Sequence, residues 1–507
     1  MRLSKNILSL IDTDNISVPS IANLELPEKV LQFGTGVLLR GLPDYFIDKA
    51  NKKGIFNGKI VVVKSTETNG ADAFDAQDGL YTQWVSGIEN GYLVNKYIIN
   101  GSISRVLTAS KEWESILALA ESKDMQIIIS NTTEAGLVLD ANDRIDGGVP
   151  RSFPGKLLAF LYKRWEYFNG SLDAGMVVLP TELLLNNGQL LLQFINSLVD
   201  SNSLDPNFKT WLNEANHFCN TLVDRIVPGK LSGELQKEAI KKFGYNDELM
   251  IMSEPFKLWA IESDSVRVNE ILSFANADAN MVIVKSIEQF RNLKLRLLNG
   301  AHTFSCGLAL LAGFETVKEA MSNHSFVGFL TSLMKTEIAP CLIEDGIEIQ
   351  ISKEFANSVL ERFANPTIEH RWLSITMNYT EKMRTRNISL LFQYFQTNKS
   401  VPEKMTIGFA GYLLFMQHLN FKDGHFYGSF NSLSYKIDDT KATTLHPKLL
   451  NLTTEQYVHS ILRDISLWGT DLSQLIGFEE QLIKTMKNIR EIGVINYLNQ
   501  TLKQMSL

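Results

Sequence analysis

The sequence predicts two domains, an N-terminal α/β domain built on a parallel sheet and a mainly α-helical C-terminal domain. In the first half, short Val- and Ile-rich strands alternate with helical stretches, and one of these strands runs into a Gly-x-Gly turn. Beyond residue 285, long helical stretches follow one another without a convincing strand, and 429–444 has the pattern of a polar loop. A chain of 507 residues is also too long for one hydrophobic core. We therefore assign residues 1–278 to the α/β domain and 279–507 to the helical domain.

The composition is typical of a soluble globular protein. The formal net charge is -7 and there is no basic tract, which disfavours nucleic acid or an anionic membrane as a partner. No apolar run is long enough to cross a bilayer, and the N-terminus does not resemble a signal peptide. Cys219, Cys306 and Cys341 are too far apart for a metal site and are typical of buried thiols in a reducing compartment. We expect a cytoplasmic protein without a metal. No helical stretch has sustained heptads, so the sequence does not predict the oligomeric state.

A strand, a Gly-x-Gly turn and a helix follow one another over residues 29–50, which is the layout of a dinucleotide-binding site. Gly34 and Gly36 would let the backbone approach a pyrophosphate at the N-terminus of the helix. The third glycine of the usual pattern is absent, since Leu39 occupies its position. Arg40 could add a phosphate contact. A tight turn without a ligand would explain the same two glycines.

A second strand at 59–63 completes a βαβ unit and favours a Rossmann-type domain. Lys64 ends this strand, and Glu67 follows slightly late. An acidic residue at this point favours NAD because it holds the ribose 2′-hydroxyl, whereas Lys64 could accept the additional phosphate of NADP. We therefore expect NAD and leave NADP open.

Polar residues follow a further buried strand at 126–130. Asn131, Thr133 and Glu134 come after it, and ligands of a doubly wound sheet bind beyond the carboxyl ends of the strands. These residues are candidates for contacts near the nicotinamide ribose, although a capped turn would explain them equally well. Upstream, residues 93–99 and 103–107 alternate like the two strands of a hairpin.

An amine, an amide and an imidazole share one helical stretch in the second half. At about 100° per residue, Lys294 and Asn299 lie about 140° apart, and His302 falls between them. Lys can exchange a proton, Asn can donate a hydrogen bond to an oxygen that gains negative charge, and His can orient that oxygen. These groups suit the interconversion of a carbonyl and an alcohol. A solvated helix face is the simpler explanation on spacing alone.

Four motifs carry a resemblance to a known family: Gly34–Gly36 with Arg40, the segment 220–226, the segment 254–256, and the set of Lys294, Asn299 and His302. Taken together, they resemble the mannitol dehydrogenase family of polyol and hexuronate oxidoreductases. The resemblance covers residues from about 30 to about 415. It implies a Rossmann-type domain followed by a helical domain, and hydride transfer between a nicotinamide and a sugar carbonyl without a metal.

The resemblance also implies roles for single residues. Lys294 matches the general acid and base, and Asn299 and His302 match the residues that hold and polarise the reacting oxygen. Further positions match substrate-site residues: an acidic residue, a second amide near the oxygen and a substrate-binding lysine, which are Asp224, Asn187 and Lys382. Ser374 stands where the polyol enzymes have an arginine, which argues against mannitol as the substrate.

Within the family, the segments 130–136 and 298–303 are most similar to members that reduce the keto group of a hexuronate, tagaturonate, to altronate with NADH. The carboxylate of such a substrate calls for a cation. Four residues of one helical region are candidates: Arg371, Lys382, Arg384 and Arg386. Fructuronate or a neutral polyol such as mannitol remains an alternative substrate, and a non-catalytic nucleotide-sensing protein remains an alternative of another class.

Overall fold

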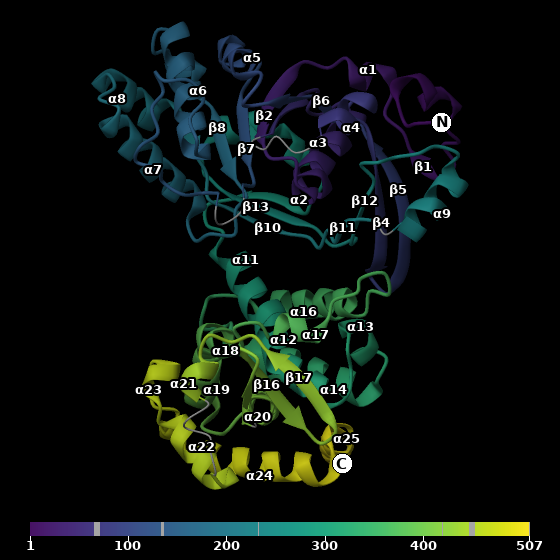
Figure 1. Ribbon diagram of the computed structural model, residues 1–507, viewed down its shortest axis with the longest axis vertical. Helices are drawn as coiled ribbons and strands as arrows, with labels where there is room; N and C mark the ends of the chain where they lie inside the picture. Colours follow the sequence, from purple (N-terminus) through teal and green to yellow (C-terminus); the bar gives the residue numbers. More distant parts are fainter. Residues whose placement is uncertain (65–70, 133–135, 232, 418, 446–451, 506–507) are drawn as a thin grey trace. The chain divides into compact units, whose positions relative to one another are not determined.

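The computed structural model describes residues 1–64, 71–132, 136–231, 233–417, 419–445 and 452–505 (Figure 1). The chain forms two compact units. The N-terminal unit comprises Met1–Gly87 and Leu93–Ile287, and the helical unit comprises Ile88–Tyr92 and Glu288–Leu507. The predicted boundary at 278/279 lies before this division because strand β14 (Met281–Val284) still pairs with β13 (Leu258–Glu262) of the N-terminal unit.

A six-stranded parallel sheet forms the centre of the N-terminal unit. Its strands lie in the order β6 (Ile103–Thr108), β3 (Lys59–Lys64), β2 (Glu28–Phe33), β7 (Ile127–Ser130), β8 (Val177–Pro180) and β9 (His217–Phe218). Counted along the chain, this is the order 3-2-1-4-5-6 of the Rossmann fold, which confirms the predicted fold class. The strand order reverses between β2 and β7.

Helices cover both faces of this sheet because successive strand residues point to opposite sides (Figure 1). Leu31 and Val61 pack with α5–α8 on one face, whereas Val30 and Val62 pack with α2 and α3 on the other. The helices of this unit are α1 (Ile21–Leu24), α2 (Val37–Gly41), α3 (Pro43–Lys52), α4 (Ala71–Ala76), α5 (Trp113–Ala118), α6 (Phe153–Tyr167), α7 (Asn187–Ser201), α8 (Pro206–Ala215), α9 (Gly233–Phe243) and α10 (Val266–Ile271).

The predicted hairpin of 93–99 with 103–107 is wrong. Strand β6 pairs in parallel with β3 in the main sheet. Strand β5 (Tyr92–Asn100) instead lies beside β4 (Tyr81–Glu89) in a second sheet. The order of that sheet is β1 (Ile16–Ser17), β5, β4, β12 (Ile251–Ser253) and β11 (Gly229–Lys230), and a third sheet contains β10 (Thr221–Asp224), β13 and β14. Alternation predicts that a segment is a strand, but it does not identify the neighbour.

The helical unit is built around α20 (Glu403–Gln417), whose residues 404–417 are all buried. Such a helix is apolar all round because other elements surround it. Helix α12 (Ala301–Leu311) packs closely on α20, since a Cβ on Gly408 would lie 2.7 Å from the Cβ and the carbonyl oxygen of Phe304. The other helices are α11 (Glu288–Leu293), α13 (Val317–Ala320), α14 (His324–Ser332), α15 (Ala339–Cys341), α16 (Ile349–Phe363), α17 (Trp372–Ile375), α18 (Tyr379–Arg386), α19 (Ile388–Asn398), α21 (Ala442–Leu445), α22 (Thr454–Leu462), α23 (Ile465–Trp468), α24 (Phe478–Ile492) and α25 (Val494–Met505).

The expectation that this half contains no sheet is also wrong. Strands β15 (Asn420–Lys422), β16 (His425–Phe430) and β17 (Leu433–Ile437) form an antiparallel sheet, and β17 lies within the expected polar loop of 429–444. The turn between β15 and β16 uses Asp423 and Gly424, both with positive φ, which is a strong hairpin signal. Tyr435 of β17 stacks on Phe415 of α20 at 4.4 Å between ring centroids, so the sheet covers the central helix.

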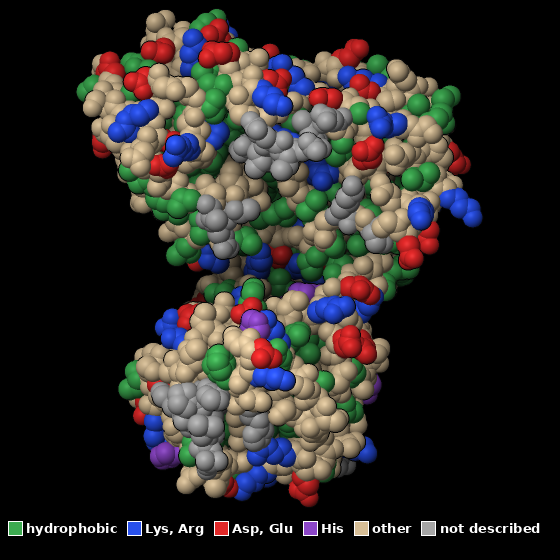
Figure 2. Space-filling view, viewed as in Figure 1, with side chains coloured by type: hydrophobic (Ala, Val, Ile, Leu, Met, Phe, Trp, Pro, Cys, Tyr) green, Lys and Arg blue, Asp and Glu red, His purple; other side chains and the backbone are tan. Residues whose placement is uncertain are grey.

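Several whole-chain expectations can be compared with the structure. The three cysteines are buried free thiols, as predicted. Over the described ranges, no helix is long and apolar enough to cross a membrane. On the face shown in Figure 2, Lys and Arg side chains lie among Asp and Glu side chains on each unit.

Candidate active site

The predicted glycine turn lies at the carboxyl end of β2 and begins α2. Gly34 has a φ of +122°, a conformation that side-chain-bearing residues rarely adopt, and its N–H donates to the carbonyl of Val63 at 3.0 Å. A Cβ at Gly34 would lie 3.0 Å from both the carbonyl oxygen of Asn131 and the side chain of Leu39. Leu39, at the position of the usual third glycine, is fully buried in the core beside the sheet. A Cβ at Gly36 would meet nothing within 4 Å, so the backbone is open there.

The turn after β7 lies next to the glycine turn at the point where the strand order reverses. The N–H of Asn131 donates to the carbonyl of Phe33 at 3.1 Å. Its side-chain amide donates to the carbonyl and hydroxyl of Thr181 at 3.1 and 3.0 Å. Dinucleotides bind at such a reversal in doubly wound sheets. The predicted contacts of Thr133, Glu134 and Glu67 lie outside the described residues.

Glu182 organises the turn after β7, and sequence reasoning gave it no role. Its buried carboxylate accepts hydrogen bonds from the N–H and the hydroxyl of Thr132 at 2.9 and 3.0 Å, and from the hydroxyl of Ser130 at 3.1 Å. The only sequence signal was its position directly after a strand. A hollow of about 380 Å³ opens beside this turn. Its lining includes Thr132, Gly136, Arg151, Ser152 and Lys156.

Arg40 has contacts inside the N-terminal unit. Its guanidinium donates to the carbonyl of Leu249 and lies over the rings of Phe74 and Tyr81, 5.7 and 5.4 Å from their centroids. Burial lowers the pKa of Arg40, although the nearby Asp44 partly offsets this. These contacts hold α2 against the surrounding core, and the phosphate contact of Arg40 stays a prediction.

Asn187 is held entirely by backbone groups. Its side-chain N–H groups donate to the carbonyls of Pro180, Glu182 and Thr221 at 3.0, 3.0 and 3.1 Å. Its side-chain oxygen accepts from the N–H groups of Gly188 and Thr221. No amide proton of Asn187 is left for a substrate oxygen in this arrangement. These hydrogen bonds fix the Asn187 side chain between the ends of β8 and β10, and its contact near the oxyanion stays a prediction. Asp224, the predicted acidic site residue, is buried at the end of β10.

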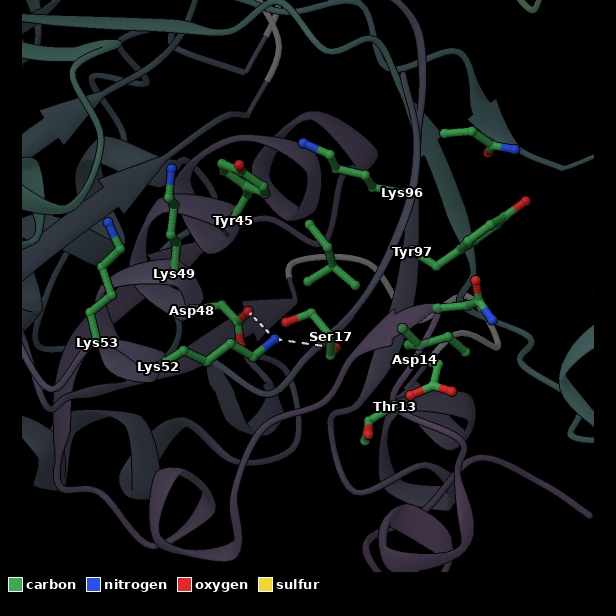
Figure 3. A pocket seen from close by; sticks show the side chains of 14 residues that line it. Thr13, Asp14, Ser17, Tyr45, Asp48, Lys49, Lys52, Lys53, Lys96 and Tyr97 are labelled. Carbon is green, nitrogen blue, oxygen red and sulfur yellow. Dashed lines mark hydrogen bonds and ion pairs between the residues drawn. The ribbon is translucent and has the colours of Figure 1, made fainter. Parts of the chain in front are cut away.

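A lysine-rich pocket of about 570 Å³ also lies in the N-terminal unit, and Figure 3 shows its lining. Lys49 forms an ion pair with Asp278 at 2.7 Å, and Lys52 forms one with Asp48 at 2.8 Å. The glycine turn does not contribute to the lining. Because these two ammonium groups already have acidic partners, we assign no ligand to this pocket.

The predicted catalytic stretch of the helical unit is a π-helix. Residues Lys294–Gly300 have i→i+5 hydrogen bonding and connect α11 to α12. The expected separation of about 140° assumed α-helical geometry, and the π-helix corrects it, because i→i+5 bonding brings residues five apart towards the same side. Lys294 and Asn299 are five apart, and both are partly exposed. π-Helical segments frequently occur at functional sites.

His302 follows in the first turn of α12 and is buried among rings. It stacks on Phe363 with 4.0 Å between ring centroids and meets His370 and Trp372 edge to face. Burial lowers the pKa of His302 well below its usual value, and nearby cations lower it further. Its Nε2 is buried without a hydrogen-bond partner within the described part of the chain. A neutral imidazole with one unused ring nitrogen can hydrogen-bond to a substrate oxygen.

The four cations proposed for a substrate carboxylate have different surroundings. Arg371 and Arg384 are exposed, and Arg384 pairs with Glu381 at 2.6 Å. Lys382 and Arg386 are partly buried, and both charges act on His302. Arg362 of α16 also acts on His302, and sequence reasoning did not identify it. The structure therefore distinguishes Lys382 and Arg386 from the other two candidates.

Comparisons with known proteins agree with these observations. Residues 28–272 match the mannitol dehydrogenase Rossmann domain, and residues 286–490 match the mannitol dehydrogenase C-terminal domain. An altronate oxidoreductase of Bacillus subtilis is 35% identical over 486 residues, covering 94% of this chain and 95% of that protein. One from Escherichia coli O157:H7 is 33% identical over 478 residues, covering 93% and 96%.

Two solved structures have the same fold. The mannitol 2-dehydrogenase of Pseudomonas fluorescens, solved with NAD and D-mannitol, aligns with a TM-score of 0.68 at 20% identity over 99% of this chain and all of that one. A D-sorbitol dehydrogenase aligns with a TM-score of 0.79 at 20% identity over 98% of this chain and all of that one. With family models matching both units and relatives matching almost end to end, the chain belongs to the mannitol dehydrogenase family of oxidoreductases.

Proposed function

We propose that this enzyme reduces the keto group of tagaturonate to give altronate, with NADH as the reductant, and that it catalyses the reverse oxidation. The observation that carries the proposal is the similarity of nearly the whole chain to altronate oxidoreductases, at 35% identity for the Bacillus subtilis protein. Partly buried Lys382 and Arg386 beside His302 support a substrate that carries a carboxylate.

The glycine turn fits a dinucleotide. At Gly34 a Cβ would crowd the neighbouring turn, and at Gly36 the backbone is open to a ligand. Gly34, Gly36 and the N-terminus of α2 would hold the pyrophosphate, and Asn131 would lie near the nicotinamide ribose. When bound, NADH supplies the hydride. We keep Arg40, Thr133 and Glu134 as proposed cofactor contacts, and NAD rather than NADP as the proposed form.

Three side chains would stabilise the negative charge that develops on the reacting oxygen: Lys294, Asn299 and His302. The Asn299 amide donates a hydrogen bond to the keto oxygen as negative charge develops on it. The unused Nε2 of His302, when it carries the ring proton, donates a second one. Lys294 then delivers a proton to this oxygen, and in the oxidation it takes the proton back. We propose Asp224 and Lys382 as further substrate contacts.

No metal is needed in this scheme, because the lysine proton and two hydrogen-bond donors stabilise the developing alkoxide. We therefore expect turnover to survive treatment with a chelator.

The test is NADH oxidation, followed by absorbance, with tagaturonate, fructuronate and fructose in parallel. Rapid turnover with tagaturonate alone is expected. Turnover with fructuronate or fructose alone would retain the family chemistry but reject the substrate. NADH binding without turnover of any of the three, repeated with NADPH, would support a nucleotide-sensing protein instead.

A further inference from the structure

Two cations share one face of α18. Lys382 and Arg386 are four residues apart, so their side chains are neighbours on the helix surface. The ammonium group of Lys382 donates to the carbonyl of Ile375 at 3.0 Å. The guanidinium of Arg386 donates to the hydroxyl of Thr303 at 3.3 Å. Both side chains are partly buried.

Arg386 contacts the helix that carries the proposed catalytic residues. Thr303 follows His302 directly, and its hydroxyl donates to the carbonyl of Asn299 at 2.7 Å. The Thr303 hydroxyl therefore links the guanidinium to the backbone of Asn299 through two hydrogen bonds. The carbonyl of Arg386 also accepts a hydrogen bond from Arg296 of the π-helix at 2.6 Å, which fixes the end of α18 beside that segment.

Among the residues that the structure describes, neither cation forms an ion pair, in contrast to Arg384, which Glu381 neutralises. The charge of Asp439 acts on Lys382 and offsets part of this, whereas no carboxylate acts on Arg386 in the same way. Burial lowers the pKa of Lys382 and of Arg386, and the charge of Arg386 lowers the pKa of Lys382 further. Two like charges that are partly removed from water repel each other. A bound anion would offset this repulsion.

We propose that Arg386, acting with Lys382, binds the carboxylate of the sugar acid and makes the site selective for uronates over neutral sugars. The inference rests on the proposed function and adds the residue that determines substrate class. A guanidinium can hold a carboxylate through two parallel hydrogen bonds, which an ammonium group cannot do. One N–H of Arg386 is used by Thr303, which orients the remaining N–H groups.

The test compares two ligands that differ in the carboxylate alone. Altronate and the polyol altritol are titrated calorimetrically into the full-length protein with NAD present. The variants are Arg386→Gln and, as a matched control on the same helix, Arg384→Gln. We expect Arg386→Gln to weaken altronate binding by about 10- to 100-fold, the usual effect of losing a hydrogen bond to a charged group. Altritol binding and Arg384→Gln should be unchanged.

Turnover provides a second measurement. In Arg386→Gln, KM for tagaturonate should rise more than kcat falls, and any turnover of fructose should be unchanged. A purely structural role at Thr303 would instead lower turnover of both sugars. Arg386→Lys keeps the charge, so it should bind altronate better than Arg386→Gln, and it replaces that variant if the glutamine protein does not fold.

The outcomes separate this inference from the proposed function. Wild-type turnover of tagaturonate together with equal altronate binding by both glutamine variants would overturn the role of Arg386 and keep the function. Altronate binding that depends on Arg386, without tagaturonate turnover, would keep the carboxylate site and reject the function. A wild-type protein that binds altronate no better than altritol would overturn the inference outright.

Discussion

The turn after β7 depends on one carboxylate, and its removal should weaken NADH binding. Glu182 accepts three hydrogen bonds, from Ser130 and from two groups of Thr132, while only 2% of its own surface is exposed. The change Glu182→Ala leaves the backbone N–H of Thr132 without its acceptor. The two hydroxyl groups can rotate towards other partners, whereas the backbone N–H cannot rotate independently.

The expected loss of NADH affinity in Glu182→Ala follows from these hydrogen bonds. A hydrogen bond to a charged group contributes roughly 1.5–3 kcal/mol, and the loss of the N–H bond alone is therefore about 2 kcal/mol. If NADH must restore the order of this turn when it binds, its affinity falls by roughly 30-fold, since 1.4 kcal/mol corresponds to a factor of ten. Glu182→Gln keeps an acceptor for Thr132 and should show a smaller loss.

Calorimetric titration with NADH measures this effect directly. Glu166→Gln, an exposed glutamate on α6, is the matched control and should bind NADH normally. A normal melting temperature together with unchanged NADH affinity in Glu182→Ala would refute the role of this turn in cofactor binding. A protein that melts early but binds NADH normally when folded would assign Glu182 to stability alone.

Three further predictions concern single residues. Gly34→Ala should lose NADH affinity and melt at a lower temperature. Alanine at a φ of +122° is strained by about 1–3 kcal/mol, and its Cβ would contact Asn131. Calorimetric titration with NADH and thermal melting measure the two effects. Lys294→Ala should lose roughly 10²- to 10⁴-fold in turnover and keep NADH binding; near-normal turnover of the variant would reject this role. Burial raises the pKa of Asp44 to about 8, above its unfolded value of about 3.9. Between these pH values the native state holds a proton that the unfolded state releases, so the free energy of unfolding should fall as the pH rises. Asp44→Asn should therefore flatten this decline in urea midpoints measured at pH 5 and pH 8, and a parallel decline in the variant would contradict the assignment.

The features that the sequence predicted well have local causes. A strand that runs into Gly34 and Gly36 and then into a helix is readable because backbone sterics and hydrophobic periodicity act over a few residues. The parallel strands at 59–63 and 126–130 were recognisable for the same reason, since strands buried on both faces are apolar without interruption.

Features that depend on distant partners were missed. The alternation of 103–107 predicts a strand but does not place it beside β3. The sheet that covers α20 was overlooked because its strands are short and partly polar, although Asp423–Gly424 marks the hairpin. The π-helix at 294–300 has no sequence periodicity of its own, and it alone changes the angle between Lys294 and Asn299.

The site residues show the same division. The chemical types at positions 294, 299 and 302 were visible in the chain, but the burial of His302 against Phe363 depends on the packing of α16 on α12. Arg384 and Arg386 are two residues apart with the same side chain. Arg384 pairs with Glu381 three residues earlier on the same helix, which is a local contact, whereas only tertiary packing places Arg386 against Thr303. Asn187 gives no sequence signal that backbone groups occupy its whole amide.

Hydride transfer from NADH to the keto carbon of tagaturonate is the central claim, and deuterium labelling tests it most directly. Tagaturonate is incubated with the enzyme and NADH that carries deuterium at C4 of the nicotinamide, on each face in turn, and the product is analysed by NMR and mass spectrometry. The account predicts altronate with one deuterium at the former keto carbon from one of the two labelled faces. NADH consumption that yields unlabelled altronate from both labelled forms, or another sugar acid, would contradict it.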